Sequence, residues 1–186
     1  MNDTQDNLIM QAVKNGELSE LSYLYSWYHL RLLGFFYKLS GDRDLSEDLV
    51  QETFWRILRY RKSYKSENSF KGWMFQVGRN LFYDQMNKNK PGRVVSMADV
   101  QFESASSGIL PDESAEKNER SVLLKQAMDK LPEDKKEILI LSRYEHLSYA
   151  EIGDILGCSE GAVKVRVFRA MEQLRIQFKA LNEEAI

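Results

Sequence analysis

Apolar residues recur every three to four positions along most of the chain, and no run of four to eight residues alternates apolar with polar as a half-buried strand does. This spacing predicts an all-α protein. Four helices are expected in the first half, separated by glycines or polar residues. They span Asp6–Asn15, Leu18–Ser40, Asp44–Arg61 and Phe70–Asn89. We expect them to pack into one small domain.

The periodicity stops at Pro91–Lys117, which contains two Pro, two Gly, five Ser and five acidic residues. A segment of this composition has too little apolar surface to fold by itself. We therefore expect a flexible acidic linker over residues 91–117. It would join a first domain, residues 1–90, to a second domain, residues 118–186.

Helical spacing resumes in the second domain, with helices expected over Glu119–Leu131, Tyr149–Leu156 and Glu160–Leu181. A further helix is expected from Pro132 to about Tyr144, because the proline ring presets φ and its missing N–H is no loss in a first turn. The second domain is thus predicted to be four small helices.

A helix-turn-helix is predicted from Leu147 to Leu174. Ser148 and Glu151 form a capping box, which fixes a helix start. Gly157 is placed to take the left-handed conformation that ends this helix, and Ser159 is placed to cap the next one. Ala150 is small, and we expect it where the two helices cross closely. This order of signals is that of a short helix, a tight turn and a longer helix.

The longer helix has a predicted buried stripe at Val163, Val167, Ala170 and Leu174. Arg166 and Arg169, at the edges of the outward face, suit phosphates, and Lys164 is near enough to the helix start to reach base edges. The candidate residues for duplex DNA are Ser159, Glu160, Gly161, Lys164, Val165, Arg166, Phe168 and Arg169. The alternative is a helical hairpin with a solvated basic face.

In the predicted helix Asp44–Arg61, the side opposite the apolar stripe contains Asp48, Gln51, Glu52 and Arg59 around Trp55. A large aromatic residue within a charged face is typical of a surface that binds a partner protein. The alternative is that Trp55 packs on another helix of the same domain.

Aromatic and basic residues interleave between Tyr60 and Lys90. Basic side chains follow a phosphate backbone and aromatic rings stack on unpaired bases, so this mixture suits single-stranded nucleic acid. Part of the segment is expected to be core, on the stripe that begins at Phe70. The candidate residues for contact are Lys65, Asn68, Ser69, Lys71, Arg79, Asn80 and Tyr83.

The net charge of −2 hides an uneven distribution. Residues 59–93 have nine Lys or Arg against two acids, and residues 94–119 have six acids against one Lys. Basic surfaces for nucleic acid are therefore compatible with an acidic chain. Cys158 alone forms no internal disulfide, and no leader or apolar membrane span is evident, so a cytoplasmic protein is expected.

Catalytic chemistry has no signal in the sequence. Phosphate-loop glycines, a His/Cys cluster at metal spacing and a nucleophile–base pair are all missing. We expect no enzyme activity, no catalytic residues, no metal, no cofactor and no small-molecule substrate.

The motif Asp48-Leu49-Val50-Gln51-Glu52-Thr53-Phe54 resembles the core-polymerase-binding motif of bacterial RNA polymerase sigma factors. Residues from Phe70 to Leu81 look like the adjoining minus-ten recognition and melting segment. The stretch from Leu131-Pro132-Glu133 to Leu174 is similar to region four, which reads the minus-thirty-five element. The chain is identified as resembling the short, extracytoplasmic-function (ECF) members of the sigma-seventy family, with Gly153 standing where Ala is usual.

The resemblance implies a region 2 domain and a region 4 domain whose partners are core RNA polymerase, promoter DNA as duplex and melted strand, and an anti-sigma factor, without direct membrane insertion. It assigns polymerase binding to Asp48, Leu49, Gln51, Glu52 and Trp55. One alternative is a helix-turn-helix regulator that binds duplex DNA without being a sigma subunit. Another is a module that only sequesters a protein.

Overall fold

The computed structural model describes residues 3–67, 69–88 and 115–184, and within these ranges every regular element is helical, as expected. The first half contains α1 (Asp3–Asn15), α2 (Leu21–Ser40), α3 (Arg43–Tyr60) and α4 (Phe70–Lys88). The second half contains α5 (Ala115–Asp129), α6 (Glu133–Leu139), α7 (Tyr149–Leu156) and α8 (Glu160–Glu184). Short 3₁₀ turns lie at Leu18–Glu20 and Arg61–Ser63, and a π-helical turn spans Ile140–Tyr144.

Helices α1 to α4 form the first body around an aromatic core. Tyr28, Phe35 and Phe36 of α2 are fully buried, and their rings contact Phe70, Phe75 and Phe82 of α4, respectively. The rings of Phe35 and Phe75 meet edge-on with centroids 5.3 Å apart, an arrangement that aromatic pairs favour. This core fixes α4 against α2 and leaves the opposite side of α4 for other contacts.

Helix α1 secures the segment that leads into α4. The Asn7 Oδ1 atom accepts hydrogen bonds from the Tyr64 hydroxyl at 2.9 Å and from the Phe70 N–H at 2.8 Å. Lys14 Nζ donates to the Tyr64 carbonyl oxygen at 2.6 Å. Both ends of the connection between α3 and α4 are therefore held by the N-terminal helix.

Helices α5 to α8 form the second body. Ile138 of α6 and Val163, Val167 and Ala170 of α8 are buried in its core. This confirms three positions of the stripe expected on the longer helix, and the fourth, Leu174, is half-buried. Pro132 precedes the first residue of α6, where its missing N–H costs nothing.

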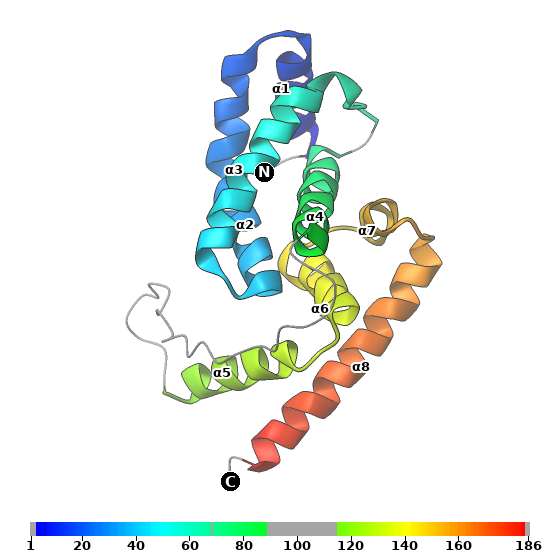
Figure 1. Ribbon diagram of the computed structural model, residues 1–186. Coiled ribbons are helices and arrows are strands. Elements are labelled where there is room, and N and C mark those ends of the chain that lie inside the picture. The colour runs from blue at the N-terminus through cyan, green and yellow to red at the C-terminus, as the bar shows by residue number, and fades with distance from the viewer. Residues whose placement is uncertain (1–2, 68, 89–114, 185–186) are drawn as a thin grey trace.

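The two bodies are in contact. Helix α7 lies beside α4, and the π-helical turn with α6 reaches α2 (Figure 1). Helix α4 is consequently placed between α3 on one side and α7 on the other.

Several sequence expectations differ from the structure. Helix α5 begins at Ala115, inside the segment expected to be linker, and residues 91–114 of that segment lie outside the described residues. The helix expected to run to Tyr144 changes from α to π geometry at Ile140. Ala150 is exposed rather than at a helix crossing; Gly153 is the residue in close contact, since a Cβ there would lie 2.6 Å from the Cys158 carbonyl oxygen.

Candidate functional site

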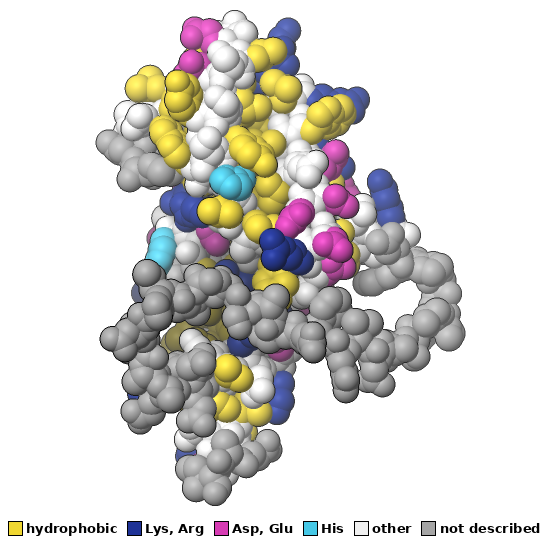
Figure 2. Space-filling model, turned by 90° about the vertical axis from the view of Figure 1, so that its left-hand side faces the viewer, with side chains coloured by type: hydrophobic (Ala, Val, Ile, Leu, Met, Phe, Trp, Pro, Cys, Tyr) yellow, Lys and Arg dark blue, Asp and Glu magenta, His cyan; other side chains and the backbone are white. Residues whose placement is uncertain are grey.

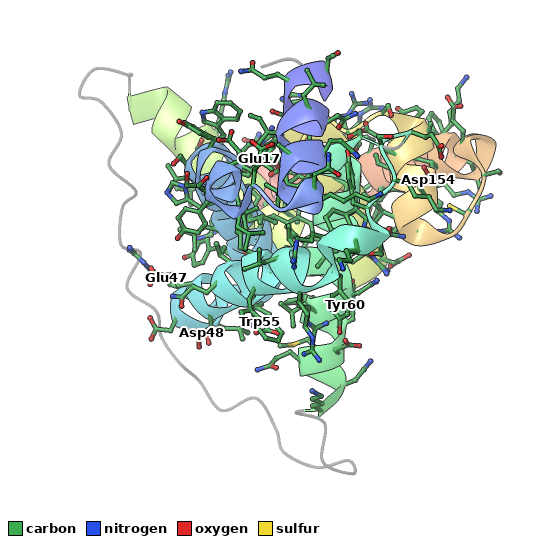
Figure 3. All side chains as sticks on the ribbon, turned by 90° about the horizontal axis from the view of Figure 1, so that it is seen from above. Glu17, Glu47, Asp48, Trp55, Tyr60 and Asp154 are labelled. Carbon is green, nitrogen blue, oxygen red and sulfur yellow. The ribbon has the colours of Figure 1, made fainter. Side chains whose placement is uncertain are left out.

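The outer face of α3 presents Trp55 to solvent with 51% of its surface exposed, so it does not pack into the first body. The Arg59 guanidinium lies over the Trp55 ring at 5.0 Å. Asp48 and Gln51 are exposed and Glu52 is half-buried on the same face. Figure 3 shows Asp48 and Trp55 along the outer side of this helix, with Tyr60 toward its end.

A hollow of about 650 Å³ opens beside this face, between α3 and the C-terminal half of α4. Leu49, only 3% exposed, lines it together with Trp55, so Leu49 contributes to its wall rather than to the open face. Arg56 spans the gap, with ion pairs to Glu52 at 3.1 Å and to Asp84 at 3.5 Å. The α4 contribution was missed by sequence reasoning, which treated the two helices separately. The α4 residues in the lining are Leu81, Asp84, Gln85 and Lys88.

The candidate single-strand residues of α4 and its preceding loop divide into two groups. Lys65 and Asn80 are exposed, whereas Ser69, Lys71, Arg79 and Tyr83 are half-buried. Asn68 lies outside the described residues. Lys71, Arg79, Asn80 and Tyr83 lie on α4, whereas Lys65 and Ser69 precede it. The sequence did not indicate what covers the second group.

The covering groups are carboxylates of the second body. Arg79 donates from Nε to Glu137 Oε1 at 2.8 Å and from Nη2 to Oε2 at 3.3 Å. The Arg79 guanidinium also lies 4.7 Å from the Tyr83 ring centre. Burial, followed by the nearby Glu137 charge, raises the pKa of Tyr83.

The helix-turn-helix has the local structure that its sequence predicts. The Ser148 Oγ accepts from the Glu151 N–H at 3.2 Å, and Glu151 Oε2 accepts from the Ser148 N–H at 2.8 Å, which completes the capping box. Gly157 has φ of 64°, the left-handed conformation that ends α7. Ser159 Oγ accepts from the Ala162 N–H at 3.3 Å and caps α8.

The outer face of α8 is open. Phe168 is 66% exposed, and all of the other α8 candidates are exposed too, as is Ser159 just before the helix. These exposed residues are Ser159, Glu160, Gly161, Lys164, Val165, Arg166, Phe168 and Arg169. A helix that begins after a tight turn and presents basic side chains outward has the form that enters a DNA major groove.

Helix α2 has exposed apolar residues that sequence reasoning did not single out. Tyr23, Leu30 and Tyr37 are each more than two-fifths exposed. Figure 2 shows hydrophobic side chains gathered on this side of the molecule. Their spacing of seven residues places them on one side of the helix, a pattern that a search for buried stripes treats as core.

Within the described residues, no cluster of three or more His, Cys, Asp or Glu is arranged to hold a metal ion. No helix in these ranges is long and apolar enough to cross a membrane.

Comparison with known proteins identifies both bodies. Residues 24–91 match the family model for sigma-70 region 2, and residues 121–174 match that for sigma-70 region 4. The ECF RNA polymerase sigma factor SigM of Bacillus subtilis is 32% identical over 87% of this chain and 97% of its own length. The factor EcfG of Rhodopseudomonas palustris is 35% identical over 77% of this chain and 76% of its own length.

Solved structures agree. The sigma factor RpoE from Bartonella quintana, in complex with the anti-sigma factor NepR, has a TM-score of 0.64 and 28% identity, covering 85% of this chain and 96% of that one. CnrH, in complex with the cytosolic domain of CnrY, has a TM-score of 0.70 at 19% identity, covering 94% of this chain and 97% of that one, and shares the fold.

A helix-turn-helix regulator that is not a sigma subunit would not account for a region 2 match ahead of the region 4 match. With both regions in order and SigM similar over nearly its whole length, the chain belongs to the ECF RNA polymerase sigma factors, which direct core polymerase to promoters.

Proposed function

We propose that three faces of the molecule divide the work of transcription initiation. The outer face of α3, with the hollow beside it, binds core RNA polymerase through Asp48, Leu49, Gln51, Glu52 and Trp55. The observation that carries this assignment is Trp55, because a tryptophan half exposed to solvent within a charged face is a typical interface anchor.

Helix α4 and its preceding loop then contact the melted minus-ten element. Arg79 and Lys71 supply positive charge, Tyr83 an aromatic ring, and Asn80 hydrogen-bonding groups for a base edge. Lys65, Asn68 and Ser69 complete this set. Helix α8 reads the duplex at the minus-thirty-five element through its outer face, and Ser159 and Glu160 lie at its start.

The chain would act as a binding subunit with no reaction of its own, in the cytoplasm where polymerase works. The solved RpoE and CnrH structures contain NepR and CnrY, respectively. By analogy, we propose an anti-sigma factor as a further partner of this chain. Co-purification from the native cell under inactive conditions tests this part, and recovery of polymerase subunits alone would count against it.

Run-off transcription with purified core polymerase tests the central proposal. Core enzyme alone starts nonspecifically, so we expect discrete promoter-dependent transcripts only when this chain is added. Genomic fragments are the templates, and a heat-denatured sample of the chain is the control. Absence of any promoter-dependent transcript across the fragment pool would contradict the proposal.

A further inference from the structure

Region 4 covers one continuous side of α4. The Ser69 Oγ, just before the helix, donates to Glu151 Oε1 at 2.5 Å, and Gln76 Nε2 donates to the Asp154 carbonyl oxygen at 3.3 Å. Between them, a Cβ at Gly72 would lie within 3.6 Å of the Glu151 side chain. Arg79 continues the same side with its two hydrogen bonds to Glu137. The spacing of three to four residues confines these contacts to one side of the helix.

Glu137 binds the Arg79 guanidinium as a DNA phosphate would. Two oxygens of one carboxylate face two nitrogens of the guanidinium, the paired geometry with which arginine also takes phosphate. The Glu137 side chain is 3% exposed and that of Arg79 is 26% exposed, so little of this arginine is left for another ligand. A carboxylate of region 4 therefore stands where nucleic acid would bind.

A second ion pair fastens the bodies away from α4. Arg31 of α2 donates from Nε to Glu145 Oε2 at 3.2 Å and from Nη2 to the Glu145 carbonyl oxygen at 2.7 Å. The Glu145 side chain is 6% exposed. Neither residue belongs to the faces proposed for polymerase or DNA, so this ion pair can be altered without changing either face.

The cover is selective. Trp55 on α3 and Phe168 on α8 remain largely exposed while α7 and α6 lie against α4. The surfaces for polymerase and for duplex DNA are thus open in the same arrangement that hides the surface for melted DNA.

We propose that the free factor is closed on itself, with the carboxylates of region 4 substituting for single-stranded DNA on α4. This inference rests on the proposed role of α4 in strand recognition. Polymerase can bind the closed factor through α3, and region 4 must leave α4 before the melted strand can enter. The factor alone therefore binds single-stranded DNA poorly, and opening is a distinct step of initiation.

A reversible covalent lock tests the proposal. A Cβ built on Gly72 lies 3.6 Å from Glu151 Cβ, within the range that a disulfide spans. The variant Gly72→Cys with Glu151→Cys is made in a Cys158→Ala background, which removes the native thiol. Each single-cysteine variant is the matched control, because it has the same substitution and cannot cross-link internally.

Oxidation should cross-link the double variant, and the locked form should lose promoter-dependent transcription by about tenfold or more, as expected for strongly coupled sites. Binding to core polymerase should be unchanged, and reduction should restore transcription. Failure of the cross-link to form, or full transcription by the locked form, would overturn the closed state. If even the reduced and wild-type factors do not initiate, the proposed function itself fails, so the two failures are distinguishable.

A charge swap tests the same closure without a cross-link. Arg31→Glu should open the factor and strengthen its binding to a fluorescent oligonucleotide of the minus-ten strand, and adding Glu145→Arg should restore weak binding. Glu172→Arg, which changes a half-exposed acid of α8 that pairs with Arg175, is the control. Circular dichroism verifies that each variant is folded. Equal oligonucleotide affinity in wild type, single variant and swap would contradict the proposal.

Discussion

Gly153 allows the turn of the helix-turn-helix to close. The Cys158 N–H donates to the Gly153 carbonyl oxygen at 2.9 Å, and this bond draws the chain after α7 back over the helix. A Cβ at this position would lie 2.6 Å from the Cys158 carbonyl oxygen, closer than real contacts allow. An alanine here therefore requires a wider turn than this one.

Gly153→Ala should destabilise the protein by about 1 to 3 kcal/mol, because backbone must shift to admit the methyl group. Thermal unfolding followed by circular dichroism measures it. Gly161→Ala is the control: nothing lies within 4 Å of its Cβ position, so helix propensity alone should leave stability equal or slightly higher. Equal melting temperatures for Gly153→Ala and wild type would show that the turn relaxes freely.

Lys164 is exposed near the start of α8, where side chains reach base edges. Lys164→Ala should weaken promoter duplex binding by about 1 to 3 kcal/mol and relax the preference at one base pair. Arg166→Ala, a change at the edge of the face, should instead weaken all sequences alike and lower the salt slope by about one. Competition binding with single-base promoter variants separates these outcomes. A uniform loss for Lys164→Ala would reassign it to the phosphates.

At the scale of elements, α3 has one buried side and one exposed side. Val50, Phe54 and Ile57 are buried against the first body, while Asp48, Gln51 and Trp55 face outward. The division follows the helical period, so burial of one side leaves the other exposed to solvent.

Replacing Trp55 with Ala should weaken binding to core polymerase by about 2 kcal/mol, the scale of an interface anchor. Gln51→Ala should act in the same direction with a smaller effect. Glu17→Ala, an exposed change outside this face, is the control. Fluorescence titration of labelled factor with core enzyme measures the affinity, and unchanged values for both α3 variants would remove the assignment.

Asn80 is exposed on α4, outside the group that region 4 covers. Asn80→Ala should leave duplex binding intact and reduce strand opening, because its proposed ligand exists only after bases unstack. Permanganate footprinting of promoter thymines measures opening, with a pre-melted template as the control. Normal strand opening by the variant holoenzyme would contradict the proposed role of Asn80.

Helices were predictable from sequence because their signals are local. The capping box at Ser148 and the left-handed Gly157 gave the bounds of α7, and apolar spacing gave the buried side of α8. The π-helical turn at Ile140–Tyr144 was not predictable, since its apolar residues fit an α-helix equally well. Contacts such as Arg79 with Glu137 join residues 58 positions apart, and such pairs leave no periodic trace.

At the scale of the whole molecule, closure buries two carboxylates. Burial raises the pKa of Glu137, which faces Arg79 and Tyr83 of α4 and has Asp134 near it on α6. Burial likewise raises the pKa of Glu145, which faces Arg31 and Lys38 of α2 and has His146 beside it. Each group binds its proton more tightly in the closed form than in an open one.

Lowering the pH from 7 toward 5 should therefore favour the closed form. The two carboxyl groups have a higher pKa in the closed form, so their protonation stabilises it relative to the open form. Burial alone would raise the pKa of Glu151, but hydrogen bonds from Ser69 and Ser148 lower it in the closed form. Protonation of Glu151 therefore disfavours the closed form, and this effect begins only when the pH falls below the ordinary pKa of a glutamate. The radius of gyration from X-ray scattering should fall as the pH falls. Glu137→Gln with Glu145→Gln should flatten the response. A radius that grows on acidification would contradict the sign.

The two roles that we propose for Arg79 constrain how the factor can vary. A substitution at Arg79 would impair both strand recognition and closure, whereas one at Glu137 would impair closure alone. A lineage that loses Glu137 would keep an active factor with a weaker resting state. Selection on regulation should therefore act on the carboxylates of region 4, and selection on transcription itself on the arginine that they cover.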